Sequence, residues 1–400
     1  MTLTLDDIKA AAGRLAGHIE RTPLRHSRTL SDITGADVWV KFENLQFTAA
    51  YKERGALNKL LLLTDEQRKL GVIAASAGNH AQGLAYHGAR LGVPVTIVMP
   101  RGTPFVKVQH TKGHGAEVVI EGDTYDEANA FAQKLRDERG LTFVHPFDDL
   151  DVMAGQGTVA LEMLQAQPEI DTLVVAVGGG GLLSGMATVA RALRPDIHIV
   201  GVQSERFASM VNAVTGSTHP IGTSSIAEGI AVGRAGHLTR AIAGALVDEW
   251  MLVDEGDIEQ AILMLLEIEK TVVEGAGAAG LAALLKAPPW LKGRHVGLVL
   301  CGGNIDPLRL QALIGRGMVR AGRLARVRVE ARDAPGALAQ LTTAVAQCGA
   351  NIEEVHHQRA FSALPVQHVE IELVLQTRNH AHVEAVIEAL RAQGFRAQAR

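Results

Sequence analysis

Cysteines, blocks of like charge and long apolar runs are all scarce in this chain of 400 residues. The two cysteines, Cys301 and Cys348, have no C-x-x-C spacing, which argues against a disulfide framework and against a cysteine zinc site. The formal net charge is only -4. The sequence contains no block of about five or more like charges, so nothing in it indicates a nucleic-acid or acidic-lipid partner. No run of roughly eighteen apolar residues occurs, and the first residues are acidic where a secretory signal would be basic. We therefore expect a cytoplasmic protein with small-molecule ligands, and neither nucleic acid nor membrane as partner.

Signatures of metal and nucleotide binding are also missing. The chain has 16 histidines but no H-E-x-x-H motif, and nothing near His110 and His114 completes a set of metal ligands. The glycine run from Gly178 to Gly181 does not fit G-x-G-x-x-G, and no Gly-Lys dipeptide occurs. Neither the dinucleotide fingerprint nor the ATP-binding P-loop therefore fits this run, and we expect no metal.

The apolar residues form short runs of strand length that alternate with helix-length patterns. This alternation is typical of a parallel sheet with crossover helices, and hence of an α/β fold. Ligands of open α/β sheets bind beyond the carboxyl ends of the strands, where this sequence places glycine and serine. The expected strands lie in the segments ADVWVKF, GVIAAS, PVTIVMP, AEVVIEG, LTFVHPF, TLVVAVGGG, HIVGVQ, EWMLVDE and HVGLVLCGG.

The C-terminal part of the chain follows a different pattern. After an Arg- and Gly-rich stretch, strand and helix patterns follow in the order β-α-β-β-α-β, which is typical of a ferredoxin-like unit. The chain length predicts two or three domains. We therefore place a boundary between residues 320 and 325.

Two glycine-containing loops that follow expected strands are candidates for anion binding. Gly178 to Gly181 would let backbone N–H groups converge on an oxyanion at a helix start, and a single phosphate on a cofactor fits best. The plainer alternative is a tight turn without a ligand. In the loop Ser76 to His80, the backbone donors and the Ser76 hydroxyl could bind a carboxylate, and Asn79 could reach a phenolic or carbonyl oxygen.

Several of these residues have a second interpretation. Ser76 could be only a helix cap, or the nucleophile of a serine hydrolase, since AASAG is one residue short of G-x-S-x-G. Lys52, in TAAYKERGA, is either a solvated charge or a catalytic lysine. Cys301 is either a small buried hydrophobe or a weak donor to a ring nitrogen. Glu274 is either a site acid or a cap, and we favour a packing role for the small-residue helix that follows it.

Four stretches in a fixed order together resemble one family: KFENLQFTAAYKERGA, ASAGNHAQG, VGGGGLLSG and LCGGNID. Over residues 20 to 310 they resemble the threonine/serine dehydratases among the pyridoxal-phosphate enzymes of fold type II. That resemblance implies an α/β fold with two open twisted sheets, like the tryptophan synthase β chain. It also implies a catalytic domain over residues 1–320, with a smaller subdomain at roughly 45–145.

The resemblance implies a role for each matching residue. Lys52 would bind pyridoxal 5'-phosphate covalently and act as the base on the substrate Cα proton, with Tyr51 packed against the cofactor. Asn79 would hydrogen-bond the phenolic oxygen of the cofactor, and Cys301 would face its ring nitrogen. The phosphate would be bound by Gly178, Gly179, Gly180, Gly181 and Leu182, and the substrate carboxylate by Ser76, Ala77, Gly78 and His80.

The implied reaction is the elimination of water from L-threonine or L-serine, which yields ammonia with 2-oxobutanoate or pyruvate. A neutral thiol opposite the ring nitrogen favours β-elimination. Related serine racemases carry a second serine where this chain has Ala77, which disfavours racemisation. Serine racemase and 3-hydroxyaspartate dehydratase stay open within the family, as do a serine hydrolase and a non-enzymatic amino-acid sensor outside it. Ala50 and Tyr51 replace the usual Ser-Phe pair, which leaves substrate scope open.

The C-terminal part, which contains EARDAPGALAQLTTAVAQCGANIEEVHH, resembles an ACT regulatory domain. Asp333, Pro335, Gly336 and Leu338 fit its loop-to-helix signature. This resemblance implies an ACT domain over residues 325–400, an amino-acid effector, and a homo-oligomer that is a dimer or a tetramer.

Overall fold

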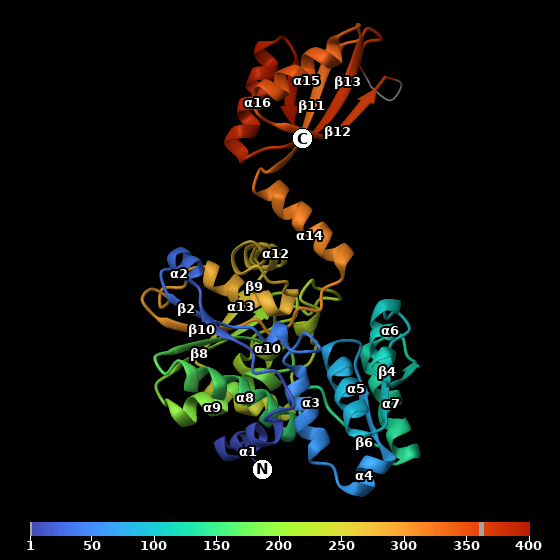
Figure 1. Cartoon of the computed structure of the whole chain (residues 1–400), viewed down its shortest axis with the longest axis vertical. Coiled ribbons are helices and arrows are strands. Elements are labelled where there is room, and N and C mark those ends of the chain that lie inside the picture. The colour runs from blue at the N-terminus through green and yellow to red at the C-terminus, as the bar shows by residue number, and fades with distance from the viewer. Residues whose placement is uncertain (1, 360–363) are drawn as a thin grey trace. The chain divides into compact units, whose positions relative to one another are not determined.

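The computed structural model describes residues 2–359 and 364–400, and the chain divides into two compact units, Met1–Ile305 and Asp306–Arg400 (Figure 1). Each unit has an apolar core of its own. Across the described residues, no helix is both long and apolar enough to cross a membrane. In the same residues, no group of three or more histidine, cysteine, aspartate or glutamate side chains is placed to hold a metal ion.

The first unit contains a six-stranded sheet in the order β1-β2-β10-β7-β8-β9. All neighbouring strands are parallel except β1, which pairs antiparallel with β2 at one edge. The strands are β1 (Leu24–His26), β2 (Asp37–Lys41), β7 (Thr172–Ala176), β8 (His198–Ser204), β9 (Glu249–Val253) and β10 (His295–Val299).

Helices cover both faces of this sheet, so that it forms the middle of three layers (Figure 1). Helix α13 packs on strands β7 to β10 and against α12, and α8, α9 and α1 pack together on the opposite face. The helices of this part are α1 (Leu5–Leu15), α2 (Arg28–Thr34), α8 (Leu150–Ala166), α9 (Gly181–Leu193), α10 (Ser209–Thr215), α11 (His237–Leu246), α12 (Glu255–Met264) and α13 (Gly275–Leu285). Short turns of helix are η1 (Glu43–Leu45), η2 (Glu228–Ile230) and the π-helix η3 (Leu265–Glu269).

A second, four-stranded parallel sheet has the order β5-β4-β3-β6. Along β3, Val72 and Ala74 belong to the core under α3 and α5, whereas Ile73 and Ala75 belong to the core under α7. This alternation is the period of two that a strand buried on both faces requires. The elements are α3 (Lys52–Leu61), α4 (Asp65–Leu70), β3 (Val72–Ala75), α5 (Asn79–Leu91), β4 (Val95–Met99), α6 (Phe105–Gly113), β5 (Glu117–Ile120), α7 (Tyr125–Arg139) and β6 (Thr142–Phe143).

The second unit begins with helix α14 (Pro307–Arg320) and continues into an antiparallel sheet of order β12-β13-β11-β14. Two helices contribute apolar residues to the core of this sheet. The elements are β11 (Leu324–Arg332), α15 (Ala337–Gln347), β12 (Asn351–Gln358), β13 (His368–Gln376), α16 (His380–Ala392) and β14 (Arg396–Ala399).

The predicted fold class is confirmed in both units. Each of the nine apolar segments contains a strand, and the C-terminal elements follow the expected β-α-β-β-α-β order. The short edge strand β1 was not among the expected strands, because its sequence, Leu-Arg-His, has no apolar run.

Candidate active site

Lys52 is the first residue of helix α3, and the loop before it pairs with the loop that follows β10. The Gly303 amide donates a hydrogen bond to the Ala49 carbonyl at 2.8 Å, and the Tyr51 amide donates to the Cys301 carbonyl at 3.2 Å. Ala49 has a φ of 54°, which is uncommon for a residue with a Cβ. These bonds join two segments far apart in the sequence, and they bring the start of helix α3 next to Cys301.

The Lys52 side chain is half-buried. Its Nζ donates a hydrogen bond to the Pro146 carbonyl at 2.6 Å and lies 5.4 Å from the centre of the Tyr51 ring. Burial lowers the pKa of Lys52 to about 8, although nearby Cys301 and Glu274 act in the opposite direction. A much larger fraction of this amine is therefore neutral, and so nucleophilic, near pH 7 than in an exposed lysine.

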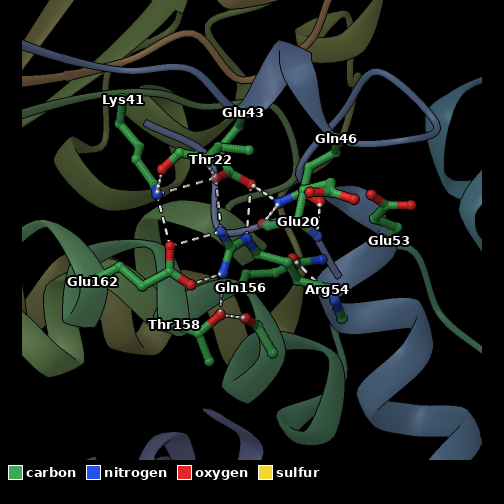
Figure 2. A network of polar contacts seen from close by, with 12 residues as sticks. Glu20, Thr22, Lys41, Glu43, Gln46, Glu53, Arg54, Gln156, Thr158 and Glu162 are labelled. Atoms are coloured by element: carbon green, nitrogen blue, oxygen red, sulfur yellow. Dashed lines mark hydrogen bonds and ion pairs between the residues drawn. The ribbon is translucent and has the colours of Figure 1, made fainter. Parts of the chain in front are cut away.

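A buried ionic network anchors helix α3 two residues beyond Lys52 (Figure 2). Arg54 is fully buried and donates to both carboxylate oxygens of Glu43, at 2.7 and 2.8 Å, and to both of Glu162, at 2.7 and 3.0 Å. Lys41 Nζ donates to Glu162 at 2.6 Å, so that two cations face two carboxylates. The network joins α3 to the end of β2, to η1 and to α8.

The glycine run follows β7 and ends at Gly181, the first residue of helix α9, so that it joins a strand to a helix as the sequence predicts. The backbone N–H groups of residues 178–183 donate no hydrogen bond within the described part of the chain. Gly180 has a φ of 95°, and the Gly179 carbonyl accepts a hydrogen bond from the Thr239 hydroxyl at 2.7 Å. A Cβ at Gly179 would lie 2.4 Å from ring atoms of Phe147. The loop therefore needs glycine, and its free donors at a helix N-terminus suit an anion.

The glycine run and Lys52 share neighbours. Phe147, which lies over Gly179, directly follows the carbonyl that accepts the Lys52 hydrogen bond. On the other side, a Cβ at Gly178 would lie 3.1 Å from the Gly229 carbonyl, and a Cβ at Gly229 would lie 3.3 Å from Glu274 Oε1. The glycine run, Lys52 and Glu274 therefore belong to one site.

Ser76, Ala77 and Gly78 form the loop after β3, and Asn79 and His80 are the first two residues of α5. The Ser76 hydroxyl accepts a hydrogen bond from the Gly78 amide at 3.3 Å, and Ser76, Ala77 and Gly78 are half-buried. The His80 ring is buried and donates from Nε2 to the Val144 carbonyl at 3.0 Å. Burial and the charge of Lys52 lower the pKa of His80 to about 3, so that this ring is neutral near pH 7.

Asn79 contacts Glu274, for which the sequence leaves a site acid and a helix cap open. Asn79 Nδ2 donates to Glu274 Oε1 at 2.7 Å, and Asn304 Nδ2 donates to Asn79 Oδ1 at 2.8 Å. Burial raises the pKa of Glu274 to about 7 and holds the pKa of the Cys301 thiol far above its usual range. The small residues after Glu274 favour a packing role in the sequence; in the structure Glu274 directly precedes helix α13, but its side chain bonds Asn79 and makes no cap hydrogen bond.

The serine-hydrolase alternative gains no support from this geometry. Within the described residues, Ser76 has no hydrogen bond with a histidine or a carboxylate. A nucleophilic serine needs such a base within hydrogen-bond reach.

Comparison with protein families and relatives gives consistent matches along the chain. The profile of the family described as pyridoxal-phosphate dependent enzyme matches residues 15–302, and that of the ACT domain matches residues 322–393. The chain is 43% identical, over 395 residues and 98% of each chain, to a protein of Thermotoga maritima named L-threonine ammonia-lyase. It is 45% identical, over 392 residues and 97% of each chain, to a protein of Geobacter sulfurreducens with the same name.

Solved structures share the fold of the first part of the chain. The processed form of threonine deaminase isoform 2 from Solanum lycopersicum superposes with a TM-score of 0.72 at 33% identity, covering 78% of this chain and 91% of that chain. Maize serine racemase superposes with a TM-score of 0.74 at 33% identity, covering 80% of this chain and 99% of that chain.

The residues of the site fit pyridoxal phosphate. The free amides of residues 178–183 suit its phosphate, the Lys52 amine of lowered pKa suits its aldehyde, and the Asn79 amide suits its phenolic oxygen. The expected cofactor thus agrees with the family match and with the donors that the site offers. The chain belongs to the pyridoxal-phosphate-dependent enzymes of fold type II and carries a C-terminal ACT domain.

Proposed function

We propose that this enzyme is a threonine ammonia-lyase, which eliminates water from L-threonine to give 2-oxobutanoate and ammonia, and converts L-serine to pyruvate in the same way. The observation that carries the proposal is the similarity to relatives of that name over 97 to 98% of the chain. That similarity includes the ACT domain as well as the catalytic part.

We assign the cofactor contacts as follows. The backbone amides of Gly178 to Gly181 and of Leu182 bind the phosphate, Asn79 donates to the phenolic oxygen, and Tyr51 packs beside the ring. When bound, pyridoxal phosphate supplies an electron-withdrawing ring that acidifies the Cα–H bond of an amino acid. The free amides of the glycine run and the lowered pKa of the half-buried Lys52 support these assignments.

Lys52 is the residue that binds the cofactor covalently and moves the proton. With a pKa near 8, its Nζ is able both to attack an aldehyde as a neutral amine and to hold a proton taken from the substrate Cα. Cys301, which we place opposite the ring nitrogen, stays a neutral thiol because burial raises its pKa. A neutral thiol gives the ring nitrogen no charge partner, and this favours prompt β-elimination.

The loop from Ser76 to His80 binds the substrate carboxylate through its backbone amides and the Ser76 hydroxyl. The His80 side chain is occupied with the Val144 carbonyl, so we assign its amide rather than its ring to the substrate. Ala77 has no group that could protonate the substrate, which argues against a racemase.

The proposal is tested by measuring 2-oxo acid formation from L-threonine, L-serine and 3-hydroxyaspartate side by side. L-threonine should be turned over fastest. If only 3-hydroxyaspartate were turned over, the proposed substrate would be wrong. Lys52→Ala should remove the visible colour of the bound cofactor and at least about a thousandfold of the activity. Lys69 is an exposed lysine on α4, so Lys69→Ala is the control and should change neither the colour nor the activity.

We also propose a homo-oligomer, a dimer or a tetramer, with an amino-acid effector bound at the ACT domain over residues 325–400. The edge strand β12 supports this, because it pairs on one side only and most of its residues are exposed. The start of the ACT match at residue 322 supports a catalytic domain over 1–320. Light scattering on the purified chain tests the oligomer, and a monomer would overturn it. A cytoplasmic location stays a proposal.

A further inference from the structure

A chain of hydrogen bonds runs through the site, and it joins segments from four parts of the sequence. Asn304 Nδ2 donates to the Thr48 carbonyl and to Asn79 Oδ1, each at 2.8 Å. Asn79 Nδ2 then donates to Glu274 Oε1 at 2.7 Å. The Glu274 amide closes the chain by donating to the Gly302 carbonyl at 3.0 Å.

The Thr48 carbonyl fixes the direction of the side-chain bonds in this chain. The Thr48 carbonyl can only accept, so the amide nitrogen of Asn304 must point toward it, and the same nitrogen donates to Asn79. Asn79 must therefore present its oxygen to Asn304. If the Asn79 amide were reversed, two donors would face each other at Asn304 and two oxygens would face each other at Glu274.

This arrangement leaves one N–H group of Asn79 without an acceptor among the residues that the structure describes. An asparagine amide has two N–H donors, and Glu274 takes only one of them. Asn79 is half-buried, whereas Glu274 is only 9% exposed. Gly302 confines the pair, because a Cβ at that position would lie 2.3 Å from Glu274 Oε1 and 3.2 Å from Asn79 Nδ2.

We infer that Glu274 and Asn304 are positioning residues, which hold the Asn79 amide in the one orientation that keeps an N–H free to donate to the phenolic oxygen of the cofactor. The inference rests on the proposed role of Asn79. In this inference Glu274 acts by accepting a hydrogen bond from Asn79, and neither its negative charge nor a proton that it could donate is required.

An isosteric pair of variants separates these roles. Glu274→Gln keeps an acceptor oxygen for Asn79 but removes the charge, whereas Glu274→Leu removes the acceptor at similar size. The apo-protein is titrated with pyridoxal 5'-phosphate, and the dissociation constant and the position of the visible absorption band are recorded. Because no substrate is present, neither readout depends on which amino acid the enzyme converts.

We expect Glu274→Gln to bind the cofactor within about twofold of the original chain, with an unchanged band. Glu274→Leu should bind about tenfold or more weakly, the loss expected for one hydrogen bond to a charged group, and its band should move to shorter wavelength as the phenol gains a proton. Equal losses in both variants would overturn the inference, because the charge would then matter. Unchanged affinity in Glu274→Leu would overturn it as well.

A second variant tests the other end of the chain and guards against misfolding of Glu274→Leu. Asn304→Asp replaces the donor by an acceptor of the same size, and we expect a loss of about tenfold or more in cofactor affinity. Asn351→Asp makes the same change at an exposed position on strand β12, and it should leave the cofactor affinity unchanged. Affinity retained in Asn304→Asp would overturn the inference. An original chain that bound no cofactor would overturn both this inference and the proposed function.

Discussion

At the scale of single residues, Lys52 is held at a fixed place in the site and has a lowered pKa. Its place at the start of α3 is set by the paired loops around Ala49 and Cys301, and burial of its amine lowers its pKa to about 8. At pH 7, about a tenth of such amines are neutral, compared with roughly one in three thousand for an ordinary lysine. The burial that orders Lys52 therefore also makes it reactive.

The lowered pKa predicts how the apo-protein captures its cofactor. Only the neutral amine attacks an aldehyde, so the second-order rate of capture should rise about tenfold per pH unit below about pH 8 and level off above it. Stopped-flow absorbance from pH 6 to 10 measures this rate. A rate that kept rising to pH 10 would mean that the pKa of Lys52 lies near its ordinary value of 10.5.

At the scale of elements, the sequence predicts the strands and the site loops well, and for a definite reason. Apolar runs bounded by glycine identify buried parallel strands, and the carboxyl ends of parallel strands meet at one edge. Local patterns do not reveal partners, however. Asn79 and Glu274 are 195 residues apart, and Asn79 and Asn304 are 225 apart, so only the folded chain shows that they touch.

The buried network beneath α3 predicts a large loss of stability in one variant. Arg54→Met would remove one of the two buried cations that pair with Glu43 and Glu162, and we expect a loss of about 3–5 kcal/mol in the free energy of unfolding. Arg101→Met is the matched control, because Arg101 also pairs with two carboxylates but is exposed; it should cost less than about 1 kcal/mol. Urea unfolding of the apo-proteins measures both, and similar losses in the two variants would contradict the prediction.

The glycine run predicts a defect in cofactor binding that leaves the rest of the fold in place. In Gly179→Ala the new methyl group would overlap Phe147, whose ring packs edge-on against His145 with the ring centres 4.6 Å apart. The loop must shift, and we expect cofactor affinity to fall about tenfold or more as its amides lose alignment. Gly13→Ala, in helix α1, adds the same methyl group where nothing lies within 4 Å. Gly13→Ala should bind the cofactor with unchanged affinity. Unchanged affinity in Gly179→Ala would be evidence against a phosphate at this loop.

At the scale of the whole molecule, catalysis and regulation are assigned to separate parts of the chain. All the proposed site residues, from Tyr51 to Cys301, belong to the first unit, and the ACT match belongs to the second. The sheets of the two units also differ: those of the first unit are parallel apart from the edge strand β1, and that of the second is antiparallel. The patterns of the sequence change near residue 320, close to the start of the ACT match at residue 322, whereas the compact units divide between Ile305 and Asp306, before helix α14.

If the ACT domain regulates the enzyme, its effect should disappear when it is removed. We expect branched-chain amino acids to change threonine turnover by the full chain about fivefold or more, the lower end of ordinary allosteric coupling, because an effector that prefers one state of the oligomer shifts its equilibrium. A chain that ends after Arg320 should keep its affinity for the cofactor and show no response. Steady-state 2-oxobutanoate formation, with and without each amino acid, measures this. Identical profiles for the two chains would mean that these amino acids do not act through the C-terminal domain.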